Sequence, residues 1–139
     1  MGYTHYWRLN DGKKINSKKL KQAIGVMGKI VKDQDKILAS WDGIGKPIVT
    51  EKEINFNGKK DFSHENFRIF MNWDGDFDFC KTARKPYDIV VVACLSVLKY
   101  YLGDSVRVSS DGEGEELKEG LELAKTYIPE LDMESIFSN

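Results

Sequence analysis

The chain has 139 residues, of which 41% are hydrophobic and 31% are charged, and its formal net charge is -1. This length and composition suit one globular domain with a substantial core, so we expect residues 1–139 to form a single domain. A nearly neutral chain argues against a polybasic membrane binder and against sequence-specific nucleic-acid binding. The longest apolar run, residues 89–98, is shorter than the roughly 20 residues that a membrane-spanning helix needs.

The two cysteines, Cys80 and Cys94, lie far apart and form no CxxC pair, and no histidine pair accompanies them. This pattern predicts neither a zinc site nor a disulfide, and we expect no metal and no cofactor. Unpaired cysteines are typical of a reducing compartment, so we expect the protein in the cytoplasm.

The N-terminal half alternates between strand and helix patterns. Residues 2–9 are rich in aromatic and β-branched side chains and predict a strand. Ser17 is the expected N-cap of a helix whose apolar residues recur at helical spacing. Residues 53–57 and 65–71 carry strand patterns, and the region 40–72 otherwise offers no motif.

The C-terminal half predicts strands over residues 77–81 and 105–109 and helices over residues 86–102 and 117–128. Residues 130–139 are expected to dock on the domain or to contact a second subunit. The order of elements predicts an α+β fold, with an antiparallel or mixed sheet packed with about three helices.

The helix over residues 86–102 is apolar nearly all the way round, so we expect it to be largely buried at the centre of the fold. Pro86 suits the first helical turn, and Gly103 supplies a stop.

The turn before this helix is basic and carries a hydroxyl: Lys81, Thr82, Arg84 and Lys85. A helix start leaves backbone N–H groups without partners and carries a partial positive charge. Cations there are unfavourable unless an anion accompanies them, which predicts a phosphate or carboxylate site. The alternative is that the cations are simply solvated.

A second candidate site follows the next predicted strand and contains Arg107, Ser109, Ser110 and Asp111. Two hydroxyls, a carboxylate and a guanidinium suit a ribose, a phosphate or a base edge. The alternative is an Asx-type turn into the last helix.

The first predicted strand places Tyr3, His5 and Trp7 on one face, where aromatic rings offer stacking surfaces. The alternative is a core face, with His5 as a hydrogen-bonded interior histidine. A thiol nucleophile at Cys80, paired with His5 or His64, is a weaker hypothesis because Cys80 is expected to be buried. We therefore assign no catalytic residue.

Three blocks, residues 2–7, 77–88 and 107–112, together resemble a family of small proteins found in phages and bacteria. The resemblance implies a phage or bacterial setting, with the cytoplasm of the bacterial host cell as the location, and it implies no activity.

We therefore hypothesise a non-enzymatic protein that binds an anionic nucleotide-type ligand, such as a phage sponge for a host cyclic-nucleotide immune signal. Lys81, Arg84 and Lys85 would contact phosphates, Thr82 and the two serines would donate hydrogen bonds, and Tyr3, Trp7 or Tyr87 would stack on a base. A homo-oligomer would let two subunits grip the ligand. The alternatives are a small enzyme that acts on a nucleotide or phosphoester, and an inhibitor that binds a host protein.

Overall fold

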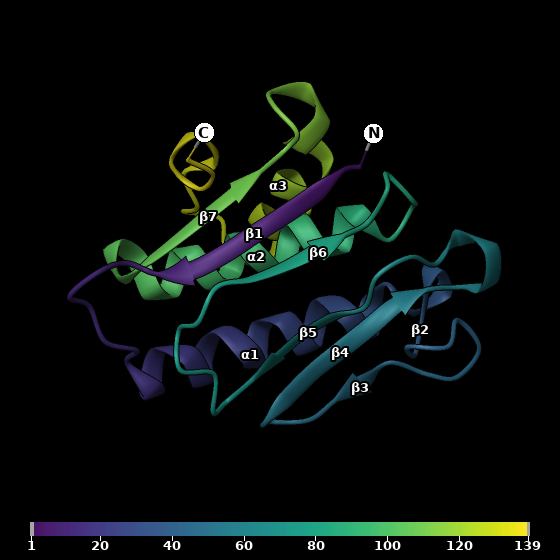
Figure 1. The fold of residues 1–139 in the computed structure, drawn as a ribbon, viewed down its shortest axis with the longest axis horizontal. Helices are drawn as coiled ribbons and strands as arrows, with labels where there is room; N and C mark the ends of the chain where they lie inside the picture. Colours follow the sequence, from purple (N-terminus) through teal and green to yellow (C-terminus); the bar gives the residue numbers. More distant parts are fainter. Residues whose placement is uncertain (1, 139) are drawn as a thin grey trace.

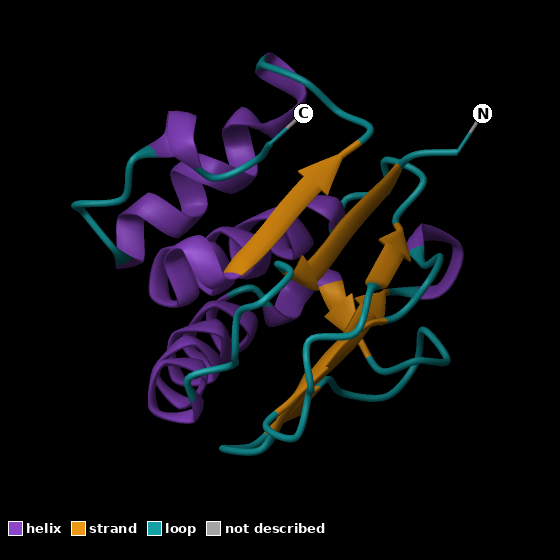
Figure 2. Cartoon of the chain, turned by 60° about the vertical axis from the view of Figure 1, so that its left-hand side comes forward, coloured by secondary structure: helices purple, strands orange, loops and turns teal. Residues whose placement is uncertain are grey.

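The computed structural model describes residues 2–138, and within them two antiparallel sheets pack on one side against helices (Figure 2). In chain order the strands and helices are β1 (Thr4–Leu9), α1 (Ser17–Asp33), β2 (Leu38–Ala39), β3 (Ile48–Val49), β4 (Glu53–Gly58), β5 (Phe67–Phe70), β6 (Asp78–Lys81), α2 (Asp88–Leu102), β7 (Val106–Ser110) and α3 (Glu115–Tyr127). The predicted α+β class with about three helices is confirmed.

The first sheet has the order β6-β1-β7, so β1 lies between two antiparallel neighbours. Its register places His5 opposite Cys80 on β6 and opposite Ser110 on β7. The second sheet has the order β2-β4-β3, and β5 also pairs with β4. The two sheets lie side by side, with β6 and β5 along their facing edges (Figure 1).

The apolar helix α2 contacts α1, α3 and β7, and its buried residues include Val92, Leu95 and, in its first turn, Asp88. Its contact with α3 is close, because a Cβ built on Gly120 would lie 2.4 Å from Cβ of Val92. Gly103 follows the last residue of the helix as its C-cap, and glycine adopts its positive φ of 54° without the steric cost of a side chain.

Two helix starts differ from the prediction. The N-cap of α1 is Asn16 rather than Ser17, and its side-chain oxygen accepts from the backbone N–H of Lys19 at 3.1 Å. Helix α2 begins at Asp88 rather than Pro86, because the preceding residues form a separate turn that is described below.

The C-terminal tail docks on β7, as one of the two alternatives predicted. Phe137 forms a parallel bridge with Val108, and the N–H of Ser138 donates to the Val108 carbonyl at 2.9 Å. Ile136 is buried beside them. Of the helices found in residues 2–138, none is both long and apolar enough to cross a membrane.

Candidate functional site

His5 is fully buried and both of its ring nitrogens are hydrogen-bonded. Nε2 lies 2.6 Å from Oδ1 of Asp88, and Nδ1 lies 2.7 Å from Oγ of Ser110. A carboxylate only accepts, so Nε2 donates its hydrogen to Asp88, and Nδ1 and the Ser110 hydroxyl share the second hydrogen bond. We call Ser110, His5, Asp88 and Thr82 the His5 network.

Asp88 is the centre of charge in this network. Thr82 donates its hydroxyl to the same Oδ1 at 2.5 Å, and Asp88 lies in the first turn of α2. A carboxylate at this position complements the partial positive charge of the helix start. The protein's own Asp88 is therefore the anion that complements the partial positive charge at the start of α2. This corrects the expectation that an external anion is needed there.

The turn between β6 and α2 has an unusual backbone. Ala83 and Arg84 both have positive φ, at 52° and 58°, a conformation that costs a non-glycine residue about 1–2 kcal/mol. The N–H groups of Thr82 and Ala83 both donate to the Tyr3 carbonyl, which anchors the turn to the start of β1. Strain of this kind persists where surrounding contacts enforce it, and it is frequent at binding sites.

The strained turn places the Arg84 side chain against Tyr3 and Glu116. The guanidinium lies 4.1 Å from the centroid of the Tyr3 ring, and it donates two hydrogen bonds to one carboxylate oxygen of Glu116, the shorter at 2.9 Å. Arg84 is therefore partly neutralised by an acid of the protein. Lys85 makes no ion pair within residues 2–138.

A pocket of about 240 Å³ lies beside Arg84, and we call it the Arg84 pocket. Its lining residues are Tyr3, Arg84, Lys85, Pro86, Asp88, Ile89 and Glu116. Two cations and two acids thus line one small cavity, and Asp88 belongs both to this lining and to the His5 network.

Tyr3 joins the pocket to the network. Burial, and then the negative charges of Asp88 and Glu116, raise the pKa of its phenol to about 12. A Cβ built on Gly112 would lie 2.0 Å from the Tyr3 hydroxyl, so only glycine fits at that position. Gly112 also donates its N–H to the Ser110 Oγ at 2.9 Å.

The structure brings together most of the residues predicted for the site. His5, Thr82 and Ser110 share the His5 network, while Tyr3, Arg84 and Lys85 line the pocket beside it. Asp111 instead holds the start of β1, since it accepts from the Thr4 N–H and from the Tyr6 hydroxyl, both at 3.0 Å. This contact joins the end of β7 to β1.

Other predicted roles are wrong. Trp7 and Tyr87 are 1% and 0% exposed, so neither ring can stack on a ligand, and the Tyr87 hydroxyl donates to the Glu65 carbonyl at 2.5 Å. Tyr3 is 2% exposed, so it supports Arg84 and offers no open face for a base. Thr82 cannot donate to a ligand because Asp88 accepts its hydrogen.

Three further predicted residues lie outside the Arg84 pocket. Within the described chain its lining does not include Lys81, whose side chain packs beside Gly2. Arg107 and Ser109 lie on β7 opposite Arg8 and Tyr6 of β1. Arg107 is exposed and Ser109 is half-buried, so the cluster predicted around residues 107–111 is divided between the sheet and the network.

Two acids of the site were not predicted as site residues. Asp88 was visible only as a helix-start residue, and Glu116 belonged to an acidic run before the last helix. No local pattern pairs either of them with His5 or Arg84, because the pairs are separated by 83 and 32 residues.

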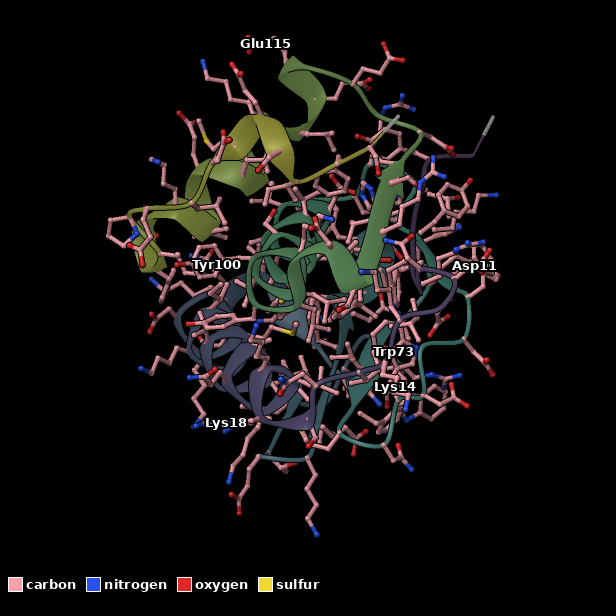
Figure 3. All side chains as sticks on the ribbon, turned by 90° about the vertical axis from the view of Figure 1, so that its left-hand side faces the viewer. Asp11, Lys14, Lys18, Trp73, Tyr100 and Glu115 are labelled. Carbon is pink, nitrogen blue, oxygen red and sulfur yellow. The ribbon has the colours of Figure 1, made fainter. Side chains whose placement is uncertain are left out.

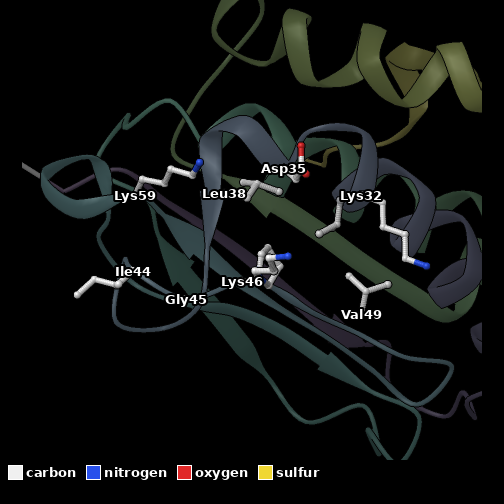
Figure 4. A pocket seen from close by; sticks show the side chains of 10 residues that line it. Lys32, Asp35, Leu38, Ile44, Gly45, Lys46, Val49 and Lys59 are labelled. Carbon is white, nitrogen blue, oxygen red and sulfur yellow. The ribbon is translucent and has the colours of Figure 1, made fainter.

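A larger pocket of about 520 Å³ lies beside α1 and the loop before β3 (Figure 4). Lys32, Lys46 and Lys59 line it, but their ammonium groups point in different directions, so they do not form a common anion site (Figure 4). No group of three or more metal-ligating side chains occurs among residues 2–138.

Comparison with known proteins adds no relative to this description: no family model, no curated protein and no solved structure matches the chain.

Proposed function

We propose that this protein binds an anionic nucleotide-type ligand at the Arg84 pocket and releases it unchanged. The observation that carries the proposal is the position of Arg84, which a strained turn holds over the Tyr3 ring in the lining of the pocket. A guanidinium fixed in this way loses little freedom when it binds a phosphate bidentately.

Glu116 competes with such a ligand but does not block it. The side chains of Arg84 and Glu116 are 58% and 45% exposed, and an exposed ion pair contributes only about 0–1 kcal/mol. A phosphate carries more charge and more acceptor oxygens than one carboxylate oxygen, so it can replace Glu116 on Arg84. Lys85 supplies a second cation beside it.

The pocket's size limits what it encloses. Small-molecule pockets usually measure about 300–1,000 Å³, and this one is about 240 Å³. It therefore holds a phosphate and part of a sugar, and the rest of the ligand extends outward. In this proposal a second copy of the chain covers that part, as in a homo-oligomeric sponge.

We also propose a phage or bacterial setting for this activity. The ligand we propose is a cyclic nucleotide that signals in host immunity, and sequestration needs no catalytic group. Cys80 and Cys94 are both buried and unpaired, which suits the reducing cytoplasm of a bacterial cell.

The test is calorimetry with a panel of cyclic mono- and dinucleotides and the matching nucleosides. Arg84→Ala should lower the affinity for a bound nucleotide at least tenfold, because it removes a bidentate contact. Glu116→Gln should raise it several-fold, because the competing charge is gone. Ligand recovered intact after the complex is heated supports binding without turnover.

Glu115→Gln is the matched control. Both glutamates lie in the first turn of α3, but Glu115 projects from the helix start at the edge of the molecule (Figure 3) and its side chain is 89% exposed. If Glu115→Gln and Glu116→Gln change the affinity equally, or if Arg84→Ala leaves it unchanged, the pocket is not the site.

A second candidate function is a hydrolase, and the geometry of the His5 network favours it. A serine hydroxyl, a histidine and a carboxylate joined by bonds of 2.7 Å and 2.6 Å are the parts of a nucleophilic triad. Its weakness is access, because Ser110 is 9% exposed and Gly112 bonds its oxygen. Labelling by a fluorophosphonate that disappears in Ser110→Ala would support this function, and an unlabelled wild-type protein would exclude a serine nucleophile.

A further inference from the structure

A second small pocket lies between the facing edges of the two sheets, and we call it the seam pocket. At one end the sheets are tied together: the Glu65 N–H donates to the Lys81 carbonyl at 3.1 Å, and the Lys81 N–H donates to the Glu65 carboxylate at 2.7 Å. Beside this tie lies a cavity of about 320 Å³. Its lining residues are Trp7, Glu65, Asn66, Arg68, Asp78 and Phe79.

Trp7 brings an unused hydrogen-bond donor to this pocket. Its side chain is 1% exposed, and its indole Nε1–H has no hydrogen-bond partner among the described residues. A buried indole N–H normally finds an acceptor, because leaving it unpaired forfeits the hydrogen bond it made to water. Trp7 is one of the residues that line the seam pocket.

Asn66 brings an unused acceptor to the same pocket. Its side-chain oxygen is buried and has no partner within residues 2–138. The neighbouring amides fix its orientation: Asn55 donates its Nδ2 to Glu53 at 3.0 Å, which leaves the Asn55 oxygen to accept from Asn66 Nδ2. The Asn66 oxygen is therefore the atom of this amide that has no partner among the described residues, and Asn66 lines the seam pocket.

One donor and one acceptor without partners, on two residues that line the same cavity, define the ligand they fit. Its edge must present an acceptor to Trp7 and a donor to Asn66, and each of the nucleobases carries both kinds of group on one planar edge. Phe79 lies at the pocket with its ring 49% exposed, so it offers a face on which a base can stack.

Charge favours a base rather than a free phosphate. Arg68 is exposed at the pocket, but Glu65 and Asp78 also line it, so the lining has no excess of positive charge. A volume of about 320 Å³ is at the low end for small-molecule sites, which suits a base with part of its sugar.

We infer that the seam pocket binds a nucleobase-type heterocycle through the Trp7 indole N–H and the Asn66 side-chain oxygen, with Phe79 stacked on its face. This site is separate from the Arg84 pocket, because the residues that line the two cavities do not overlap. It therefore stands or falls independently of the proposed function.

The test is a titration of the ¹⁵N-labelled full-length protein with adenosine, guanosine, cytidine and uridine, observed at the tryptophan indole N–H signals. The chain has three tryptophans, and the other two are internal controls. Trp41 is 73% exposed, and Trp73 already donates to the Asp76 carbonyl at 3.1 Å. We expect at least one nucleoside to shift the Trp7 signal saturably while the other two signals stay in place.

Phe79→Ala should lower the affinity for that nucleoside about fivefold or more, because the substitution removes the aromatic ring on which the base stacks. Phe62→Ala is the matched control, because Phe62 is also an exposed aromatic, at 60%, but lies outside the seam pocket. Arg84→Ala should leave the Trp7 shift unchanged, so failure here and failure of the proposed function are distinguishable.

Three results would overturn the inference. The first is that no nucleoside shifts the Trp7 signal and that the Trp7 indole proton contacts a bound water, which would show that an ordered water alone fills the site. The second is that N-methylacetamide shifts the Trp7 indole signal as strongly as any nucleoside, which would identify a groove for peptide groups. Alternatively, Phe79→Ala binds with wild-type affinity.

Discussion

His5 and Trp7 lie two positions apart on β1, both are buried, and they differ completely in hydrogen bonding. Both ring nitrogens of His5 have partners at 2.7 Å or less, whereas the Trp7 indole N–H has none within residues 2–138. The His5 nitrogens belong to a network whose members bond to one another, whereas Trp7 is a lining residue of the seam pocket. A saturated polar cluster stabilises the fold, while an unsatisfied one is where a ligand adds something the fold lacks.

Asp88→Ala tests the saturated side most severely. It removes the acceptor shared by His5 and Thr82 and leaves both polar groups buried without it. We expect a loss of about 1–3 kcal/mol in the free energy of unfolding for each of the two groups, measured by chemical denaturation. Asp61→Ala, at an exposed position, is the control. A loss below about 1 kcal/mol would show that the His5 network does not stabilise the fold.

Gly112→Ala attacks the same network through packing. The added Cβ would lie 2.0 Å from the Tyr3 hydroxyl, so Tyr3 must move away from Ser110 and Arg84, at a cost of about 1–3 kcal/mol. Gly25→Ala in α1 is the matched control, because nothing lies within 4 Å of its added Cβ, and it should stabilise the helix by about 1 kcal/mol. Equal effects of the two substitutions would contradict this packing.

Alkaline pH should lower the free energy of unfolding through Tyr3, which packs beside the His5 network. Burial raises the pKa of Tyr3 from 10.0 to about 12, so the folded state favours the neutral phenol. This contribution to stability is complete below pH 10 and is lost as the pH rises through about 12. Between pH 9 and pH 11 the free energy of unfolding, measured by chemical denaturation, should decrease less for Tyr3→Phe than for wild type. Equal decreases in wild type and in Tyr3→Phe would refute the assignment to Tyr3.

Asn66→Ala should have the smallest effect and sharpens the comparison. It removes an acceptor that has no partner among the described residues, so the recovered desolvation cost offsets the lost bond to Asn55. We expect Asn66→Ala to lower the free energy of unfolding by less than about 1 kcal/mol. Thr82→Val, which removes a hydroxyl bonded to a carboxylate, should cost about 1.5–3 kcal/mol. Chemical denaturation of both variants tests this order. A larger loss of unfolding free energy for Asn66→Ala than for Thr82→Val would contradict the contrast between the seam pocket and the His5 network.

The sequence predicted the elements better than their contacts. The apolar run that forms α2 and the glycine that ends it were legible, because helical periodicity and left-handed glycine are local properties. The start of α2 was placed too early, since Pro86 fits a helix start as readily as the end of the strained turn that precedes Asp88.

The candidate site was predictable only in part, for a physical reason. His5, Asp88 and Ser110 come from β1, α2 and β7, and they meet only because β1 pairs with both β6 and β7. Trp7 was predicted to stack on a ligand, but its burial depends on the helices and the second sheet that cover it. The seam pocket depends on how two sheet edges meet, and no local pattern specifies that.

The central claim is that Arg84 exchanges Glu116 for a phosphate while the His5 network stays closed. The most direct measurement follows the four arginine side-chain Nε–H signals of ¹⁵N-labelled protein during titration with a nucleotide and with its nucleoside. The account predicts a saturable shift of Arg84 with the nucleotide alone, while Arg8, Arg68 and Arg107 keep their positions. A nucleotide that binds without moving the Arg84 signal would contradict it.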